Sequence, residues 1–412
     1  ALALLALAGA VQAQSFTTLG ALPGTVGATE ALGISGDGST IIGDANAGFM
    51  AFRWTEATGM VALGDLPGGG VDSTPHDVSF DGSVIVGTGS TSSGNRAFRW
   101  TASGGVQDLG VTGTGVWSRG GAVTADGQTL FGFGPDMGSS GRAIIAWTDA
   151  GGASDAIGSG MAVGAGSCSA DGAMLGGAGY GAFSAARVWT QAGGLAYVPT
   201  PAGSNNANGA TQGVSANGLW AVGWQESQNG NLGFVHRVGG TTTHVGDLPG
   251  ASENSVLEDV SANGAVAVGF ATDTDGKEAV IWIRGQGLRV LADYLENDLD
   301  LDLGGWELTE ANGISDDGSV ICGTATNPAI FRTEAFRAEI PIINDSLCIA
   351  DRDGDYDVDL GDFGHFAAAF GTVQGQPGYD AVSDFDLDGD VDLGDFGLFG
   401  ELFGSGAGAC EP

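Results

Sequence analysis

LGISGDGSTIIG (residues 32–43) is the stretch that decides the fold. Two short apolar runs flank an Asp-Gly pair, and this pattern predicts a β-hairpin because both residues of the pair tolerate a positive φ. The phrase recurs six more times with Asp-Gly or Asn-Gly at its centre, as HDVSFDGSVIVG (76–87), GAVTADGQTLFG (121–132), GSCSADGAMLGG (166–177), QGVSANGLWAVG (212–223), EDVSANGAVAVG (258–269) and NGISDDGSVICG (312–323). Such regular repetition indicates an architecture built from one repeated unit.

A second pair of apolar runs follows each predicted hairpin, as in AFRWTEATGMVALG (51–64) and AFRWTASGGVQDLG (97–110). Each unit is therefore expected to be a four-stranded antiparallel sheet, the size of a propeller blade. One blade cannot bury both of its faces, whereas blades stacked radially cover each other. The sequence predicts an all-β, seven-bladed β-propeller over residues 16–343, and an open solenoid is the alternative.

The last unit ends with TEAFRAEIP (333–341) and has no fourth strand after it. The segment FTTLGALPG (16–24) matches the fourth-strand phrase MVALGDLPG (60–68) of the first unit. We therefore expect the N-terminal strand to complete the seventh blade and close the ring.

The ISxDGSxIxG, AFRWT and LGDLPG phrases together resemble HAF-type extracellular repeats, and the likeness spans about residues 16–341. The resemblance implies a secreted, propeller-like array. That family has no well-established biochemical activity, so the resemblance implies no catalytic residue.

Composition restricts the function. The chain has 412 residues, a formal net charge of −36 and one lysine, Lys277. Nucleic acids are unlikely partners because a phosphate backbone requires a basic surface. The only long apolar run, residues 1–13, is too short to span a membrane and is interpreted as part of a secretory signal peptide ending at Ala13. The sequence therefore predicts a bacterial exported protein, secreted or held at the cell surface.

The C-terminal segment 346–412 is expected to be a separate acidic module. DRDGDYDVDLGDF (351–363) returns as DFDLDGDVDLGDF (384–396), and alternating carboxylates on such curled loops are typical of calcium ligands. Two twelve-residue loops would bind two calcium ions through the twelve aspartates Asp351, Asp353, Asp355, Asp357, Asp359, Asp362, Asp384, Asp386, Asp388, Asp390, Asp392 and Asp395. Each loop leads into a predicted apolar helix, 362–371 or 395–404, with phenylalanines along one face.

These two loop–helix units resemble a dockerin type I module. The resemblance implies an EF-hand-like fold, two bound calcium ions and docking onto a cohesin-like partner. The partner-recognition positions hold Leu360-Gly361 and Leu393-Gly394, where cellulosomal dockerins usually carry small hydroxyl residues. Cys348 and Cys410 bracket the module, and we interpret them as a disulfide that clamps its ends. Cys168 and Cys322 lie in predicted strands and are interpreted as buried free thiols.

Other candidate sites are weaker. Five tryptophans share one repeat position and are interpreted as packing between blades: Trp54, Trp100, Trp147, Trp189 and Trp282. Four tryptophans outside that position are better candidates for a surface site: Trp117, Trp220, Trp224 and Trp306. The longest repeat spacing places an insertion at 293–306, which is either a binding loop or a structural connector. The four histidines form no recognisable catalytic or metal motif.

The sequence thus favours a secreted, non-catalytic propeller that binds an extracellular protein or glycan and is tethered by its calcium module. An extracellular glycan hydrolase or lyase is the first alternative. It would require carboxylates or histidines from several blades to converge in the central channel. A structural surface or matrix protein without a specific ligand is the second alternative.

Overall fold

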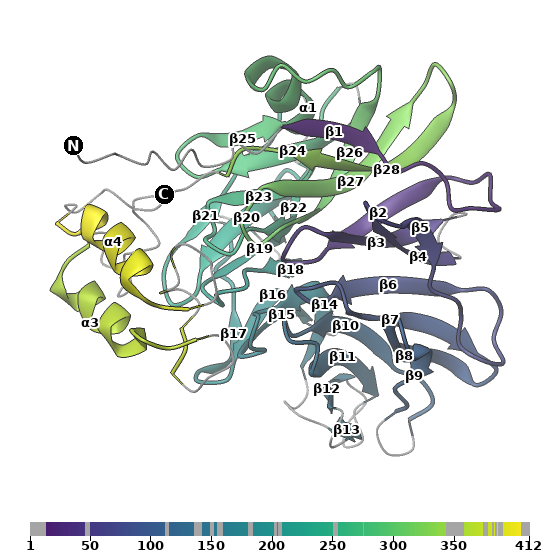
Figure 1. The fold of residues 1–412 in the computed structure, drawn as a ribbon, viewed down its shortest axis with the longest axis horizontal. Coiled ribbons are helices and arrows are strands. Elements are labelled where there is room, and N and C mark those ends of the chain that lie inside the picture. Colours follow the sequence, from purple (N-terminus) through teal and green to yellow (C-terminus); the bar gives the residue numbers. More distant parts are fainter. Residues whose placement is uncertain are drawn as a thin grey trace, which may run out of the picture.

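The computed structural model describes residues 14–45, 50–111, 115–135, 142–148, 152–154, 160–179, 184–201, 204, 208–249, 254–274, 276–342, 358–373, 378–380, 383, 385 and 390–404. These residues form seven four-stranded antiparallel sheets arranged as a propeller, together with two ten-residue helices near the C-terminus (Figure 1). The predicted seven-bladed propeller is confirmed.

Six blades follow the chain directly, and in each the first strand is innermost. Blade 1 comprises β2 (Thr29–Ile34), β3 (Thr40–Ala45), β4 (Met50–Thr55) and β5 (Gly59–Ala62); blade 2 β6 (Ser73–Val78), β7 (Val84–Thr91), β8 (Gly94–Thr101) and β9 (Gly105–Asp108); blade 3 β10 (Arg119–Val123), β11 (Thr129–Pro135), β12 (Arg142–Thr148) and β13 (Gly152–Ser154). Blade 4 comprises β14 (Met161–Cys168), β15 (Met174–Gly179), β16 (Ala186–Thr190) and β17 (Gly194–Tyr197); blade 5 β18 (Gly209–Val214), β19 (Trp220–Glu226), β20 (Asn231–Arg237) and β21 (Thr242–His244); blade 6 β22 (Ser255–Val260), β23 (Val266–Thr272), β24 (Lys277–Ile283) and β25 (Gly287–Val290).

The seventh blade joins the two ends of the propeller sequence. Its first three strands are β26 (Glu307–Ile314), β27 (Val320–Asn327) and β28 (Arg332–Glu339), and β1 (Ser15–Thr18) pairs antiparallel with β28. Ser15 pairs with Glu339, and the ring of Phe16 lies 5.8 Å from that of Phe336. The predicted closure by the N-terminal strand is confirmed.

The hairpin turns differ from the prediction in one respect. The central glycine of each turn has a positive φ, from 68° at Gly127 to 75° at Gly318. The preceding Asp or Asn does not, since among the described non-glycine residues only Asp300 and Phe331 have a positive φ. Each turn therefore resembles a type I turn that ends at a glycine in the left-handed region. In blade 2, for example, Gly82 N–H donates to the Ser79 carbonyl at 2.9 Å.

The side chain that precedes the glycine instead organises the turn. In blade 2, Asp81 Oδ1 accepts hydrogen bonds from Ser79 Oγ (3.0 Å) and Ser83 N–H (2.9 Å). Ser79 Oγ in turn accepts one from Val84 N–H at 3.0 Å. The same three bonds recur in all seven blades, so the Ser/Thr-x-Asp/Asn-Gly phrase encodes a closed side-chain network.

The propeller core consists of seven apolar clusters, one at each junction between neighbouring blades. Each of the five tryptophans at the shared repeat position packs into one of these clusters: Trp54, Trp100, Trp147, Trp189 and Trp282. Their predicted role in packing between blades is confirmed. Cys168 and Cys322 are free thiols, as predicted, although only Cys322 is fully buried.

The insertion between blades 6 and 7 is a structural connector. The three-residue helix α1 (Leu291–Asp293) leads directly into a π-helical turn, η1 (Tyr294–Asp298). Leu291, Leu295 and Leu303 are almost completely buried in the cluster between these two blades. Of the two interpretations of this insertion, the connector is the one that the packing supports.

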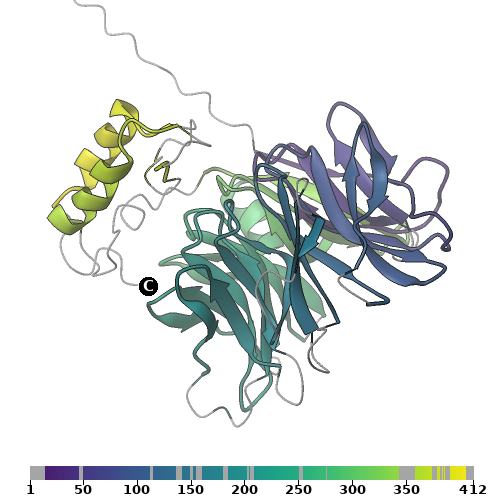
Figure 2. The same ribbon diagram turned by 90° about the horizontal axis from the view of Figure 1, so that it is seen from below.

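The C-terminal helices are α3 (Leu360–Ala369) and α4 (Leu393–Leu402), each beginning two residues before its predicted start. They lie to one side of the propeller (Figure 2). Their shared core contains Val358, Phe366, Ala369, Val391 and Phe399, with no propeller residue. Reciprocal backbone bonds link the two repeats: Gly371 N–H donates to the Val391 carbonyl (2.7 Å), and Gly404 N–H to that of Val358 (2.8 Å).

Candidate functional site

Five of the twelve predicted calcium ligands belong to the described residues: Asp359, Asp362, Asp390, Asp392 and Asp395. The other seven lie outside them: Asp351, Asp353, Asp355, Asp357, Asp384, Asp386 and Asp388. The predicted signal segment 1–13 and the predicted Cys348–Cys410 disulfide also lie outside the described residues.

Asp390, Asp392 and Asp395 bring carboxylate oxygens within 4.8 Å of one another, a geometry that can hold a metal ion. Asp392 is also the N-cap of α4: its Oδ1 accepts from Gly394 N–H at 2.6 Å. Asp395 Oδ2 returns a bond to Asp392 N–H at 2.7 Å, which completes a capping box. The capping box fixes two of the three carboxylates in place.

The first repeat has the same arrangement. Asp359 caps α3 through Gly361 N–H at 2.6 Å, and Asp362 Oδ2 accepts from Asp359 N–H at 2.7 Å. The side chains of Asp362 and Asp395 are both fully buried. Because a buried carboxylate is costly unless it is compensated, this pair of equivalent positions is suited to a bound cation.

A second candidate site lies in the central channel of the propeller. The innermost strand of every blade carries a register shift, which marks a β-bulge. Bulges re-aim side chains. Here they mark Leu32, His76, Gln212, Glu258 and Asn312 at equivalent positions of five blades. Blade 4 has a longer irregularity between Val163 and Cys168, where Ala165 is exposed to the channel.

The channel contains two connected cavities. The inner one, here called the lumen, has a volume of about 100 Å³, and the outer one, here called the mouth, about 350 Å³. Five residues line both cavities and form the neck between them: Leu32, His76, Ala165, Glu258 and Asn312. The mouth adds Asp44, Thr74, Pro75 and Glu310.

At its other end the lumen is narrowed by backbone hydrogen bonds between the hairpin turns of neighbouring blades. Phe80 N–H donates to the Ala125 carbonyl (3.1 Å), Ala125 N–H to that of Ala170 (2.9 Å), and Asp316 N–H to that of Gly36 (2.9 Å). Similar bonds join most of the remaining blades.

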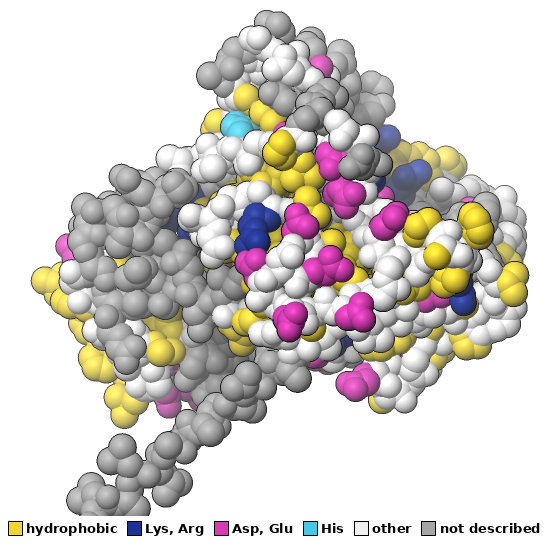
Figure 3. All heavy atoms as spheres, turned by 90° about the horizontal axis from the view of Figure 1, so that it is seen from above, with side chains coloured by type: hydrophobic (Ala, Val, Ile, Leu, Met, Phe, Trp, Pro, Cys, Tyr) yellow, Lys and Arg dark blue, Asp and Glu magenta, His cyan; other side chains and the backbone are white. Residues whose placement is uncertain are grey.

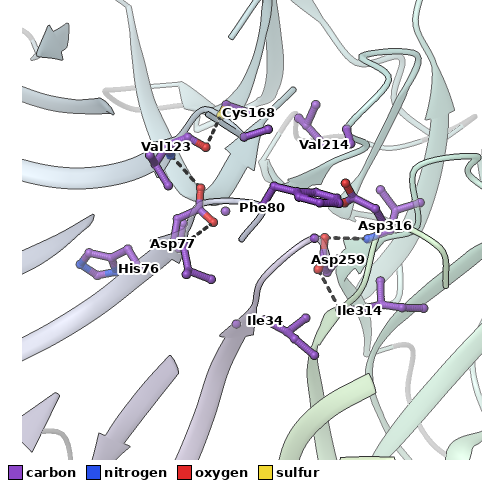
Figure 4. Close-up of a pocket in the computed structure, with 18 of the residues that line it drawn as sticks. Ile34, His76, Asp77, Phe80, Val123, Cys168, Val214, Asp259, Ile314 and Asp316 are labelled. Atoms are coloured by element: carbon purple, nitrogen blue, oxygen red, sulfur yellow. Dashed lines mark hydrogen bonds between the residues drawn. The ribbon is translucent and has the colours of Figure 1, made fainter. Parts of the chain in front are cut away.

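Asp77 of blade 2 and Asp259 of blade 6 line two different sides of the lumen (Figure 4). Asp77 accepts bonds from its neighbour Val78 N–H and, in blade 3, from Val123 N–H, both at 2.8 Å. Asp259 likewise accepts from Val260 N–H (2.8 Å) and, in blade 7, from Ile314 N–H (2.9 Å). Each carboxylate therefore ties its own blade to the next.

These carboxyl groups titrate far from their usual range. Burial raises the pKa of Asp77 to about 7 and that of Asp259 to about 8, although the backbone hydrogen bonds oppose the shift. Burial also raises the pKa of Asp316 to about 6, with a further contribution from the neighbouring Asp317 and Asp37 charges. The lumen is a low-dielectric space that disfavours several simultaneous negative charges.

The polar neck residues are individually oriented. Glu258 Oε2 accepts from Gln212 Nε2 at 3.0 Å, and burial raises the pKa of Glu258. His76 Nε2 shares a hydrogen bond with Thr88 Oγ1 at 3.1 Å, and burial lowers its pKa to about 4, with help from the Arg119 charge. Asn312 Nδ2 donates to the Ala31 carbonyl at 2.8 Å. At neutral pH the neck is thus lined by the neutral imidazole of His76 and the carboxyl group of Glu258.

Sequence reasoning did not single out these channel residues. A signal was present, since the repeat position of Asp77 and Asp259 holds Gly, Ala or Ser in the other five blades. The surface tryptophan candidates are not gathered into one site among the described contacts. Trp117 packs edge-on against Phe133 (6.0 Å), whereas the Trp220 ring lies 4.2 Å from the Arg284 guanidinium.

One face of the protein is rich in acidic side chains. Figure 3 shows Asp and Glu side chains gathered on the face seen from the side of α1 and β1, with few Lys or Arg side chains among them. This face offers little positive charge to a phosphate backbone. None of the described helices is both long and apolar enough to cross a membrane.

No family model matches the sequence, and no curated protein shows significant similarity to it. The structure is similar to an oligogalacturonate lyase from Vibrio parahaemolyticus, with a TM-score of 0.51 and 11% identity over 80% of this chain and 97% of that one. An oligogalacturonate lyase in complex with manganese gives a TM-score of 0.50 at 12% identity, covering 80% and 96%. The β-propeller domain of the trilobed protease from Pyrococcus furiosus, described as having an open velcro topology, gives 0.50 at 8% identity, covering 78% and 99%. At these identities the likeness establishes the propeller fold alone.

Proposed function

We propose that this protein is an exported, non-catalytic binding or scaffold protein. Its propeller presents the central channel to a ligand, and its C-terminal module folds around two calcium ions and tethers the propeller to an extracellular protein or glycan. The observation that carries the tether is the pair of fully buried, equivalent carboxylates of Asp362 and Asp395. The grouping of Asp390, Asp392 and Asp395 adds a ready cluster of oxygen ligands.

Calcium is the ion that best fits this donor set. The predicted loops supply carboxylate oxygens without a Cys or His, and hard oxygen donors favour calcium over the softer transition metals. Residues 345–412 contain 16 acidic residues and a single basic one, Arg352, so the chain itself offers little positive charge to balance them. A metal would supply that charge at each buried aspartate.

Chelation of the full-length protein tests the tether. We expect calcium removal to unfold α3 and α4 while the propeller stays folded, because their apolar core shares no residue with the propeller. Circular dichroism and hydrogen exchange, with and without chelator, measure both parts. Asp395→Asn should weaken calcium binding, whereas Asp380→Asn, outside both twelve-residue loops, is the matched control. An unchanged module after chelation would refute the calcium assignment, and parallel titrations with Mn²⁺ and Mg²⁺ test its selectivity.

The exposed ends of the two helices support a protein partner for the module. Leu360 and Leu393, the first residues of α3 and α4, are each 74% exposed. A cohesin-like protein is the partner that we propose. Leu360→Asp combined with Leu393→Asp should abolish its capture in a pull-down without lowering calcium affinity. Retained capture would place the docking surface elsewhere.

An extracellular hydrolase or lyase is the second candidate function. It is favoured by the convergence of His76, Glu258 and Asn312 at the neck from blades 2, 6 and 7. A screen of polysaccharides, with Glu258→Gln as the inactive counterpart, tests it. Turnover by the wild type that is lost in the variant would replace the non-catalytic proposal. A structural role without any ligand is tested by glycan-array and pull-down screens, in which it predicts no hits.

A further inference from the structure

The walls of the lumen carry four carboxyl groups. Asp77, Glu258, Asp259 and Asp316 line it, and no Lys or Arg is among the described residues that do so. Two bases lie outside it: Lys277 pairs with Glu310 at the mouth, and the charge of Arg119 acts on His76. Carboxylates that are enclosed in this way require protons or a cationic ligand.

The carboxylates are distributed along the channel axis. Glu310 lies at the mouth, Glu258 at the neck, Asp77 and Asp259 one residue deeper, and Asp316 in the turn that narrows the far end. Asp316 lies four residues beyond Asn312, which is the repeat position of Glu258 in blade 7. The acidic groups thus form a row along the channel.

Asp316 is the innermost of these groups and has the fewest polar contacts. Among the described residues its carboxylate, which is half-buried, accepts no hydrogen bond and lines the lumen. It lies with the Phe80 ring against Gly36, so closely that a β-carbon on Gly36 would be 2.7 Å from Asp316 Oδ2 and 2.5 Å from Phe80 Cδ2 (Figure 4). This carboxylate is therefore held at the end of the lumen without a partner of its own.

Apolar side chains separate the acidic levels. Between the level of Asp77 and the level of Asp316, one residue from each blade lines the lumen: Ile34, Val78, Val123, Cys168, Val214, Val260 and Ile314. Such a ring suits methylene groups rather than the hydration shell of an ion.

The spacing of the carboxylates distinguishes between two kinds of cation. A divalent metal requires several oxygen atoms around one point. Among the described residues, only Asp390, Asp392 and Asp395 bring three such atoms within 4.8 Å, so the channel carboxylates are too dispersed for a compact metal site. An elongated cation with an apolar stem fits the row of acids and the aliphatic ring together.

We propose that the channel binds an alkylammonium chain, whose methylene stem contacts the aliphatic ring and whose ammonium group reaches Asp316 past Glu258. The chain belongs either to a free diamine or polyamine, or to a lysine side chain of a partner. This inference rests on the proposed function, since it takes the channel as the ligand site.

Titration calorimetry on the calcium-saturated full-length protein tests the charge requirement. The probe is 1,6-diaminohexane, and 1,6-hexanediol is the neutral compound of equal length. We expect the diamine to bind and the diol not to bind. Glu258→Gln and Asp316→Asn should each weaken diamine binding about tenfold or more, equivalent to about 1.4 kcal/mol. Glu56→Gln, at an exposed residue of the β4–β5 turn, should leave it unchanged.

Each outcome has a definite meaning. Equal binding of the diol, or equal loss in the Glu56 variant, would overturn the proposal, as would complete competition by Mn²⁺ at matched concentration. Binding of a lysine-containing peptide but not of the diamine supports a partner side chain, and the reverse supports a free amine. Circular dichroism establishes that the variants fold. If the Asp316→Asn variant does not fold, diamine binding by the Glu258→Gln variant alone tests the proposal.

A plug in the neck separates this inference from the proposed function. Ala165 is exposed to the channel at the irregular strand of blade 4, so Ala165→Phe should block the neck without disturbing the blade. A neutral glycan that binds the wild type and is lost in Ala165→Phe would support a channel ligand but refute the alkylammonium class. Ligands that bind equally well to both proteins would refute the channel itself as the site.

Discussion

Asp77 and Asp259 occupy the same repeat position in blades 2 and 6, and each carboxylate spans the junction to the following blade. The remaining blades have only Gly, Ala or Ser there. Two of the seven junctions thus depend on a carboxyl group that also faces the lumen. Any ligand or proton that reaches the lumen therefore acts on groups that hold the ring together.

Asp259→Ala should destabilise the propeller by about 1–3 kcal/mol, because the N–H groups of Val260 and Ile314 lose their acceptor. Chemical denaturation monitored by tryptophan fluorescence measures the change. Glu56→Ala, at an exposed turn, is the control and should be nearly neutral. Equal stability of both variants would mean that channel water replaces the carboxylate at no cost.

The stability of the propeller should fall as the pH rises from 6.5 to 8.5. The folded protein keeps protons on Asp77 and Asp259 up to pKa values of about 7 and 8, whereas an unfolded aspartate has lost its proton near pH 4. The folded state therefore holds protons that the unfolded state has lost, so each rise in pH favours unfolding until these protons leave near pH 8. The buried histidines act in the opposite sense at the acidic end of this range, because their lowered pKa values keep the folded imidazoles neutral while those of the unfolded chain, with a pKa near 6.5, still bind protons.

Melting temperatures of the calcium-saturated protein across this pH range test the prediction. The double variant Asp77→Asn, Asp259→Asn should give a flatter profile than the wild type, whatever its absolute stability. An unchanged slope would show that these two groups are not the source of the pH dependence.

Gly82→Ala should destabilise the protein far more than Gly59→Ala. Both glycines have a left-handed φ, of 70° and 64°, so the backbone strain of about 1–2 kcal/mol is common to the two variants. A β-carbon at Gly82 would lie 2.1 Å from Thr40 Oγ1 of blade 1, whereas at Gly59 nothing lies within 4 Å. The difference in denaturation midpoint isolates the contact between blades, and equal midpoints would contradict it.

Phe366→Ala should unfold the C-terminal module while leaving the propeller intact. Phe366 is 1% exposed and its ring stacks on that of Phe399 at 5.3 Å, so its truncation should cost about 3–5 kcal/mol. Phe370→Ala, at a side chain that is 45% exposed, is the matched control and should cost much less. Hydrogen exchange in α3 and α4 reads out the module separately, and equal protection in both variants would refute this core.

The sequence was sufficient to predict the blades because the information is local. Each Ser/Thr-x-Asp/Asn-Gly turn is specified within six residues. The shared tryptophan position marks the second hairpin of each of the five blades that have a tryptophan there. The details of the turn were not predicted. The aspartate was expected to have a positive φ, whereas its carboxylate instead accepts hydrogen bonds from Ser Oγ and a backbone N–H.

The channel was not predictable for a different reason. Asp77, Asp259 and Asp316 are far apart in the chain, and only closure of the ring brings them to one lumen. The bulges that mark His76 and Glu258 are changes of register, which leave no distinct composition in the sequence. The calcium loops were recognisable because their ligands are consecutive, although most of these aspartates lie outside the described residues.

The pairing of β1 with β28 also determines the order in which the parts of the propeller can fold. Blades 1 to 6 each pair strands that are close in the sequence, so they can form as the chain emerges. Ser15, by contrast, bonds to Glu339 across a separation of 324 residues. Contacts between residues so far apart in the sequence form slowly, because a long loop must close before the contact can stabilise the fold. Docking of the first strand onto the last blade should therefore be the final, rate-limiting step of folding, and until then the protein has an open sheet edge at each end of its array.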